Sequence, residues 1–187
     1  MTEIVLFHHA RGLTAGVRDL ADVLGSHGHT VHTPDLFEGR VFDTVDDGVA
    51  HASSIGEDVL AARAAQATAA LPTALVYGGL SMGAARAAEG VLTRPGARGA
   101  FFLYGAVAPS WWSATWPRDV PSQVHVTERD PWREPEAEAE YVTDVPHGEL
   151  FRYPGAGHLF AEPDDPAYDA GAAGLATRRI LGLLAGL

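Results

Sequence analysis

A short stretch in the middle of the chain limits the folds open to it more than any other feature. The apolar run 75–77 predicts a buried strand, and an alanine-rich helix is predicted to begin directly after Ser81. Between them lies the pattern Gly79-x-Ser81-x-Gly83, the sequence form of a sharp strand-to-helix turn that raises a serine hydroxyl above a sheet edge. A side chain at either glycine would collide with neighbouring backbone in so tight a turn. The pattern arises by chance in about one such sequence in ten, so its context must support it.

The composition limits the kinds of partner and the kinds of site. The 187 residues are expected to form one domain, 1–187, with a full hydrophobic core. The formal net charge of −11 argues against binding nucleic acid or anionic membranes through long-range electrostatics. The chain has no cysteine, which excludes disulfides, thiolate catalysis and cysteine-based metal sites. No apolar run approaches the ~20 residues of a membrane span, and no signal peptide is visible, so we expect a soluble cytoplasmic protein.

Apolar patterns typical of strands and helices alternate along the whole chain. Strands are predicted at 4–7, 29–33, 73–77, 99–104, 123–127 and 149–153, and helices at 14–24, 55–69, 82–91, 134–141 and 173–183, with a polar loop at 38–48 and an aromatic insertion at 109–117. This alternation predicts a compact, mostly parallel sheet of about six strands with helices on both faces. Ligands bind such sheets at the carboxyl ends of the strands, and we expect four loops to converge there.

A serine hydroxyl needs a general base to become a nucleophile, and the base must itself be oriented. On this type of fold the expected order along the chain is serine, then an acid, then histidine. Three histidines follow Ser81, and only His158 comes directly after a predicted strand, in a glycine-rich loop. His125 lies inside a strand and His147 at the approach to one. His158 is therefore the predicted base.

Asp130 is the predicted acid, because it follows the strand 123–127 by three residues and precedes a proline. Glu128 is the nearest rival, and Asp144 is a weaker one because a helix separates it from the sheet edge. Taken singly, Asp130 would more often be a turn residue and His158 a surface loop histidine. The alternative that Ser81 is only a small turn residue is disfavoured because order and placement agree.

Two backbone N–H groups are needed to stabilise an oxyanion. One is predicted from Met82, at the start of a helix, and the second from Ala10, in the loop after the first strand. His8, His9 and Arg11 flank Ala10, and they either shape or bind substrate in the pocket or are solvated loop residues. The His8-His9 pair lacks further ligands at chelating spacing, so no metal is predicted.

Four tryptophans form a further candidate group. Trp111 and Trp132, with Trp112 and Trp116, could line an apolar pocket mouth. Core packing or a dimer contact is an equal alternative for some of them.

Several segments resemble the dienelactone hydrolase family of α/β-hydrolases. The segment 153–160, Tyr-Pro-Gly-Ala-Gly-His-Leu-Phe, is the most specific, and 125–131, 28–37, the turn around Ser81 and Tyr168 also match. The resemblance covers nearly the whole chain and implies an α/β-hydrolase fold without a large lid domain, with Ser81, Asp130 and His158 as the catalytic residues.

Three positions depart from that family's pattern. The namesake enzymes use cysteine as the nucleophile where this chain has Ser81. Their first loop carries a glutamate where this chain has His9, and a substrate-binding arginine occurs where this chain has Glu162. The expected substrate is therefore a small, non-anionic ester or lactone rather than dienelactone.

The leading hypothesis is a serine esterase that works through an acyl-serine intermediate without a cofactor. Thioester or amide hydrolysis by the same triad is one alternative. A non-catalytic binding protein on the same scaffold is another, although an intact triad argues against it. The expected partner is a small molecule, with no nucleic acid or membrane, and a homodimer is left open.

Overall fold

A sheet of six parallel strands forms the centre of the computed structural model, which describes all residues 1–187. The strands are β1 (Glu3–Phe7), β2 (Thr30–His32), β3 (Leu75–Leu80), β4 (Gly99–Leu103), β5 (Ser122–Thr127) and β6 (Gly148–Tyr153). Their order across the sheet is β2-β1-β3-β4-β5-β6, and every neighbouring pair is parallel. The predicted sheet is confirmed.

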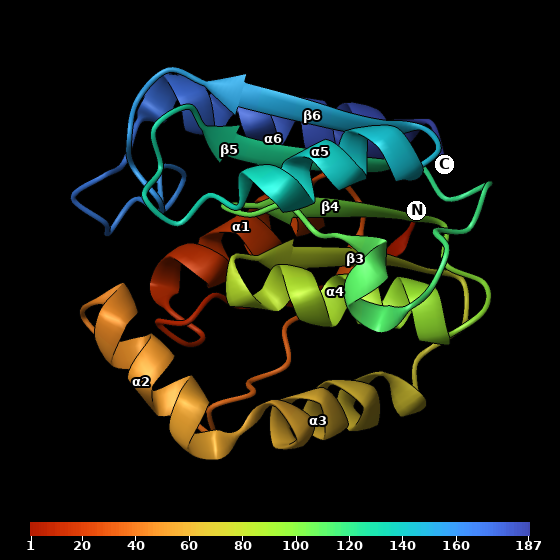
Figure 1. Ribbon diagram of the computed structural model, residues 1–187, viewed down its shortest axis with the longest axis horizontal. Helices are drawn as coiled ribbons and strands as arrows, with labels where there is room; N and C mark the ends of the chain where they lie inside the picture. Colours follow the sequence, from red (N-terminus) through yellow and green to blue (C-terminus); the bar gives the residue numbers. More distant parts are fainter.

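Helices cover both faces of the sheet (Figure 1). The helices are α1 (Ala15–Ser26), α2 (Val45–Ile55), α3 (Glu57–Ala69), α4 (Met82–Thr93), α5 (Pro135–Asp144) and α6 (Ala170–Ala185), and a 3-10 turn, η1, spans Pro109–Trp112. Helices α1 and α6 pack on one face, whereas α3, α4 and α5 pack on the other. No separate lid domain is inserted between these elements.

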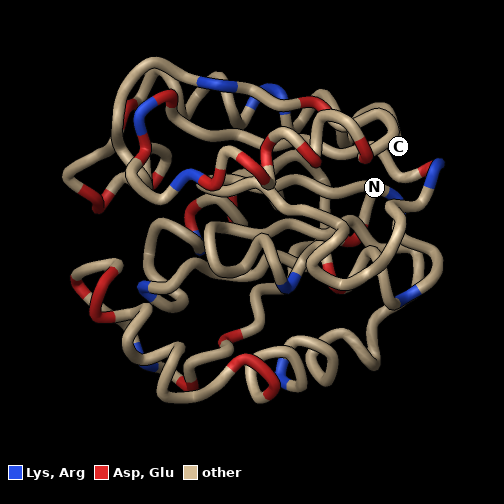
Figure 2. Tube along the Cα trace, viewed as in Figure 1, with Lys and Arg blue, Asp and Glu red and all other residues tan.

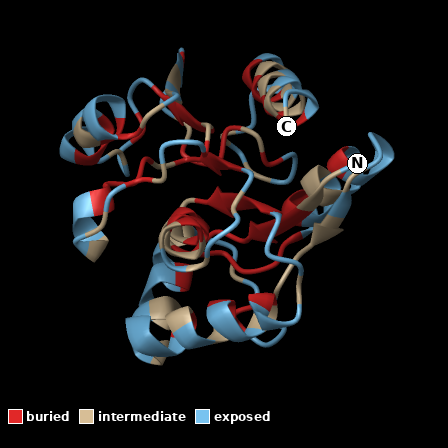
Figure 3. Ribbon diagram, turned by 90° about the vertical axis from the view of Figure 1, so that its right-hand side faces the viewer, coloured by how far each residue is buried: buried red, intermediate tan, exposed pale blue.

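The core has two layers because successive side chains of a strand point to opposite faces of the sheet. In β1, Val5 and Phe7 pack in the layer of α3, α4 and α5, and Ile4 and Leu6 pack in the layer of α1 and α6. Both faces are covered, so the central strands read as continuous apolar runs. Figure 3 shows the buried strands between helices whose outer surfaces are exposed.

Residues 45–56 differ from the sequence prediction. Residues 45–48, predicted as loop, form the first turn of α2. The predicted helix 55–69 corresponds to α3, which begins at Glu57, because a break at Gly56 separates it from α2. Gly56 causes the break, since its φ of 92° lies in the left-handed region that favours glycine. Thr44 begins α2, where its side chain accepts a hydrogen bond from the backbone N–H of Asp47 at 3.1 Å.

The strand order reverses direction at β1, which lies between β2 and β3. Loops that follow strands on the two sides of such a reversal separate and leave a crevice at the carboxyl edge. The loop after β1 and the turn after β3 meet at this point.

Figure 2 shows basic positions scattered along the trace rather than gathered on one face. None of the helices has both the length and the apolar character that crossing a bilayer requires.

Candidate active site

The turn after β3 holds Ser81 in a strained conformation. Its φ of 50° and ψ of −115° are unusual for a residue other than glycine. The backbone N–H of Ser81 donates to the carbonyl of Leu103 at 2.8 Å, which fixes the turn to β4. A Cβ at Gly79 would lie 2.4 Å from the carbonyl oxygen of Gly83, and one at Gly83 would lie 2.3 Å from that of Phe7. Backbone cannot yield cheaply at such distances, so the glycines are required by packing.

Ser81, His158 and Asp130 form a continuous hydrogen-bonded chain. Ser81 Oγ lies 2.8 Å from His158 Nε2, and His158 Nδ1 lies 2.7 Å from Asp130 Oδ2. Because a carboxylate only accepts, Nδ1 carries a proton and Nε2 is free to accept the serine proton. The second oxygen of Asp130 accepts the backbone N–H of Trp132 at 2.8 Å. The three residues predicted from chain order are thus within hydrogen-bonding distance.

Hydrogen bonds between the loops after β5 and β6 hold Asp130 and His158 near one another. Thr127 Oγ1 donates to the carbonyl of Gly157 at 2.9 Å, and the backbone N–H of Arg129 donates to the carbonyl of Gly155 at 3.0 Å. Each bond joins a residue within three positions of Asp130 to one within three positions of His158. The separation of the two side chains is therefore set by backbone contacts rather than by their own hydrogen bond alone.

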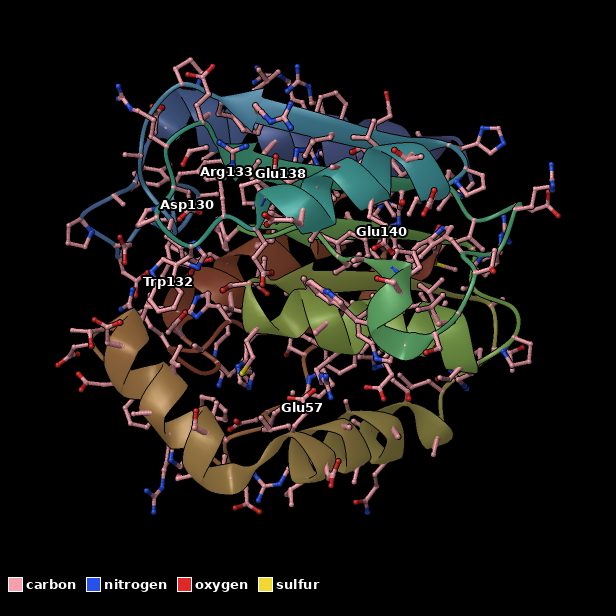
Figure 4. The ribbon with its side chains drawn as sticks, viewed as in Figure 1. Glu57, Asp130, Trp132, Arg133, Glu138 and Glu140 are labelled. Atoms are coloured by element: carbon pink, nitrogen blue, oxygen red, sulfur yellow. The ribbon has the colours of Figure 1, made fainter.

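Ion pairs to the buried carboxylate of Glu138 lie next to the Asp130 loop. Arg133 donates through Nε and Nη2 to the two carboxylate oxygens of Glu138 at 2.6 and 2.8 Å. Arg152 also donates to Glu138, at 2.8 Å. Desolvation opposes the charge of Glu138, but these hydrogen bonds outweigh it, so the pKa of Glu138 lies below its ordinary value. Figure 4 shows Arg133 and Glu138 side by side at the start of α5, next to Asp130.

Met82 and Ala10, whose backbone N–H groups are the predicted oxyanion donors, line the same cleft as Ser81. Met82 is the first residue of α4, so its N–H has no partner within the helix. The N–H of Ala10, in the loop after β1, takes part in no hydrogen bond with the protein. Gly48 of α2 lies against this loop, since a Cβ there would be 1.9 Å from the carbonyl oxygen of Ala10.

A cleft of about 420 Å³ opens above the serine. Its lining includes Ser81, Met82, His158, Trp111 and Trp132, together with Ala10 and two valines of α2. Trp111 and Trp132 are 48% and 41% exposed, as expected of side chains at a pocket mouth. In Figure 4 the side chain of Trp132 lies between Asp130 and α2. The lining is mostly apolar.

The other two tryptophans of the insertion are not part of this lining. Trp116 is buried, its ring contacts Phe102 edge-on, and its Nε1 donates to the carbonyl of Val120 at 2.8 Å. Trp112 packs partly buried against the same core layer. Core packing therefore accounts for these two residues.

His9 and Arg11 do not line the cleft, and the prediction that they do is wrong. His9 is 1% exposed, and its Nε2 lies 3.3 Å from Glu162 Oε2. Arg11 donates to the carbonyl of Phe42 and to Asp165 Oδ2, each at 3.0 Å. The loop after β1 turns both side chains toward the segment that follows His158. Arg11 is paired there with Asp165, whereas His9 Nε2 lies near Glu162 without forming a hydrogen bond.

Tyr104 also lines the cleft, although the sequence pattern does not single it out. It follows β4 with a φ of 70°, and its ring lies 5.8 Å from that of His158. Its hydroxyl donates to Glu162 Oε1 at 3.1 Å. Burial and the nearby Glu162 carboxylate raise the pKa of Tyr104 well above its ordinary value. Its position at the carboxyl end of a strand was the available signal.

Val45 and Val49 of α2 are also lining residues that were not predicted. Val45 lies within the predicted loop 38–48 and Val49 directly follows it, so the sequence pattern predicts no helical face for them. The threonine cap at residue 44 followed by the acidic pair 46–47 was the missed sign of a helix start. No group of three or more His, Asp or Glu side chains is arranged to hold a metal ion.

Comparison with known proteins gives both a family and a set of similar folds. The sequence profile of the Dienelactone hydrolase family matches residues 1–186. No curated protein matches the chain in sequence.

Three solved structures illustrate the shared fold. A protein of Klebsiella pneumoniae subsp. pneumoniae, provisionally assigned as a dienelactone hydrolase, is 18% identical with a TM-score of 0.78, over 100% of this chain and 88% of the other. The dienelactone hydrolase-like promiscuous phosphotriesterase P91 from metagenomic libraries is 21% identical, with a TM-score of 0.77 over 100% and 87% of the two chains. A Xanthomonas campestris protein, provisionally assigned to the α/β-hydrolases, is 22% identical, with a TM-score of 0.67 over 100% of both chains.

Proposed function

The chain belongs to the dienelactone hydrolase family, and on that premise we propose that it is a serine hydrolase that cleaves a small, uncharged ester or lactone. The observation that carries the proposal is the hydrogen-bonded chain from Ser81 Oγ through His158 to Asp130, with distances of 2.8 and 2.7 Å. A scaffold that only bound ligands would not require this arrangement of a nucleophile, a base and an orienting acid.

Acylation begins when His158 Nε2 takes the proton of Ser81 Oγ while Oγ attacks the carbonyl carbon. The carbonyl π electrons move to the oxygen, and the resulting oxyanion accepts from the N–H groups of Ala10 and Met82. Collapse of the tetrahedral intermediate breaks the bond to the leaving alkoxide, which takes the proton from His158. Asp130 holds the imidazole in the required tautomer and stabilises the imidazolium.

Deacylation repeats these steps with water. His158 Nε2 takes a proton from water as the oxygen attacks the acyl carbon. The second intermediate then collapses to a carboxylic acid as the bond to Ser81 Oγ breaks, and His158 returns the proton to Oγ. In a lactone the leaving alkoxide stays attached to the acyl group, so one hydroxy acid is released.

The preference for an uncharged substrate follows from the pairing of the cations around the cleft. Apart from His158, Arg133 is the basic residue in the lining, and both carboxylate oxygens of Glu138 already engage it. Arg11 is paired with Asp165 outside the lining. A substrate carboxylate would therefore enter without a free guanidinium, while Trp111 and Trp132 offer apolar surface.

A fluorophosphonate probe tests the nucleophile, because it labels an activated serine covalently. We expect labelling of the wild type and of Ser53→Ala, in which an exposed serine of α2 is removed as a control. Ser81→Ala should not be labelled. An unlabelled wild type, or equal labelling of Ser81→Ala, would refute the proposal.

A pair of matched esters tests the charge preference. Short-chain p-nitrophenyl esters should be hydrolysed with a kcat/KM at least about tenfold above that for analogues that carry a terminal carboxylate. Equal or better hydrolysis of the anionic analogues would contradict the expected substrate class.

A further inference from the structure

The peptide unit between His9 and Ala10 carries two groups that move together. The Ala10 N–H, assigned above to the oxyanion site, and the His9 carbonyl belong to one planar unit and point in opposite directions. Whatever fixes the direction of the carbonyl therefore fixes the direction of the N–H. The contacts of the His9 carbonyl, on the side away from the cleft, therefore set the direction of the Ala10 N–H.

The His9 carbonyl is held by two donors. His8 Nδ1 lies 2.8 Å from the oxygen, and the backbone N–H of Gly12 donates to it at 3.0 Å. Gly12 closes the tight turn with a φ of 90°. The contact from His8 is the only one of the two that a side-chain substitution can remove.

The proton position on His8 follows from its second contact. The backbone N–H of Leu36 donates to His8 Nε2 at 3.0 Å, so Nε2 must be an acceptor. The neutral ring then carries its proton on Nδ1, which is the nitrogen that faces the His9 carbonyl. Two backbone groups from different segments thus select one tautomer.

The environment keeps this ring neutral. His8 is fully buried, and burial lowers its pKa to about 4. Its neighbours also include His9 and Asp35, with Asp35 Oδ1 3.9 Å from Nε2, beyond hydrogen-bonding distance. That oxygen instead accepts from the backbone N–H of Phe37 at 2.9 Å.

His9 fixes the next peptide in the same loop. Its Nδ1 accepts the backbone N–H of Arg11 at 3.2 Å, while its Nε2 faces Glu162. The carbonyl of Ala10 abuts Gly48, where there is no room even for a methyl group. The peptides on both sides of Ala10 are therefore restrained by groups outside the cleft.

We propose that His8 is a positioning residue for the oxyanion site, acting through the His9 carbonyl to aim the N–H of Ala10 at the developing charge. The inference rests on the proposed serine hydrolase function. His8 touches neither substrate nor reacting atoms, and its effect is confined to states in which the carbonyl oxygen of the substrate has become an anion.

Two substitutions separate positioning from packing, because each keeps one hydrogen bond of the imidazole. The amide nitrogen of asparagine lies near the place of Nδ1, so His8→Asn retains a donor for the His9 carbonyl. The longer glutamine reaches the place of Nε2, so His8→Gln retains an acceptor for the N–H of Leu36. We expect His8→Gln to lower kcat by ~10- to 100-fold, below the 10²–10³ lost with a whole oxyanion donor, and His8→Asn to stay within about threefold of wild type. KM should change little in either variant.

A trifluoromethyl ketone inhibitor distinguishes loss of oxyanion stabilisation from a general structural defect. It adds to the serine as a tetrahedral oxyanion, so its inhibition constant should rise in His8→Gln by the same factor by which kcat/KM falls. Equal losses in the two variants, or wild-type activity in His8→Gln, would overturn the proposal.

Nitrogen NMR of the wild type keeps the proposal testable if a variant does not fold. The spectrum should show His8 protonated at Nδ1 and unprotonated at Nε2 at neutral pH, and the opposite tautomer would overturn the proposal. Failure of the proposed function is distinguishable, since the wild type would then neither hydrolyse esters nor take up the fluorophosphonate probe.

Discussion

His125 should make the stability of this protein depend strongly on pH between 7 and 5. The side chain is fully buried in β5, where its Nδ1 lies 2.8 Å from the hydroxyl of Tyr153 and its Nε2 has no partner. The imidazole stacks on the ring of Phe151, and the guanidinium of Arg179 lies over that phenyl ring, 4.1 Å from its centre. Burial, and secondly the charge of Arg179, lower the pKa of His125 from 6.5 to about 3.

The sign and size of the effect follow from proton binding. Between pH 6.5 and about 3 the unfolded chain binds a proton at His125 and the folded chain does not, so the free energy of unfolding falls as the pH falls. At pH 5 the folded state is still neutral, and the loss relative to pH 7 is about 2 kcal/mol. This value depends little on the exact folded pKa, because pH 5 lies well above it.

Urea denaturation at pH 7 and pH 5 measures the effect. In His125→Asn, which keeps a polar group near Tyr153, the loss of stability between the two pH values should be smaller than in wild type by about 2 kcal/mol. His8, whose pKa is also lowered by burial, remains in both proteins and cancels in the difference. His27→Asn, at an exposed position, controls for the removal of one imidazole. Equal losses in wild type and His125→Asn would refute the reasoning.

Three further substitutions test the turn, the acid and the cleft mouth. Asp130→Asn should lower kcat by about 10³- to 10⁴-fold in steady-state assays, because asparagine does not hold His158 in the required tautomer. Its circular dichroism spectrum should match that of wild type, and a loss of kcat under tenfold would contradict the prediction. Gly83→Ala should destabilise the fold by more than about 2 kcal/mol, since its Cβ would lie 2.3 Å from the carbonyl oxygen of Phe7, whereas Gly182→Ala, with open space around it, should be neutral or stabilising in the same melts. Trp132→Ala should raise KM for apolar esters about three- to tenfold with kcat nearly unchanged, and a fall in kcat alone would argue against a binding role.

Much of the site was predictable because parallel strands end at one edge. Once the strands before Ser81, Asp130 and His158 were identified, their loops had to converge, and the structure brings the three side chains within hydrogen-bonding distance. No distance information was needed for this, since the topology of an alternating strand–helix chain supplies it.

The residues around the triad were less predictable because their directions depend on distant partners. His9 and Arg11 are one and three residues beyond His8 in the same loop, yet the carboxylates that draw them out of the cleft come from residues 162 and 165. The positive φ of Gly56 separates α2 from α3, and only packing shows that α2 turns its valines to the cleft.

The sequence by itself determined the order of the strands and of most helices, the serine turn, and the placement of Ser81, Asp130 and His158 after three strands, because these follow from periodicity, glycine sterics and position relative to strand ends. Only the tertiary structure decided which nitrogen of His8 carries the proton and where the peptide of Ala10 points. Those features depend on the N–H of Leu36, the backbone around Gly48 and other groups brought from elsewhere in the chain. Hydrogen-bond direction is a property of three-dimensional neighbours, and local sequence does not contain it.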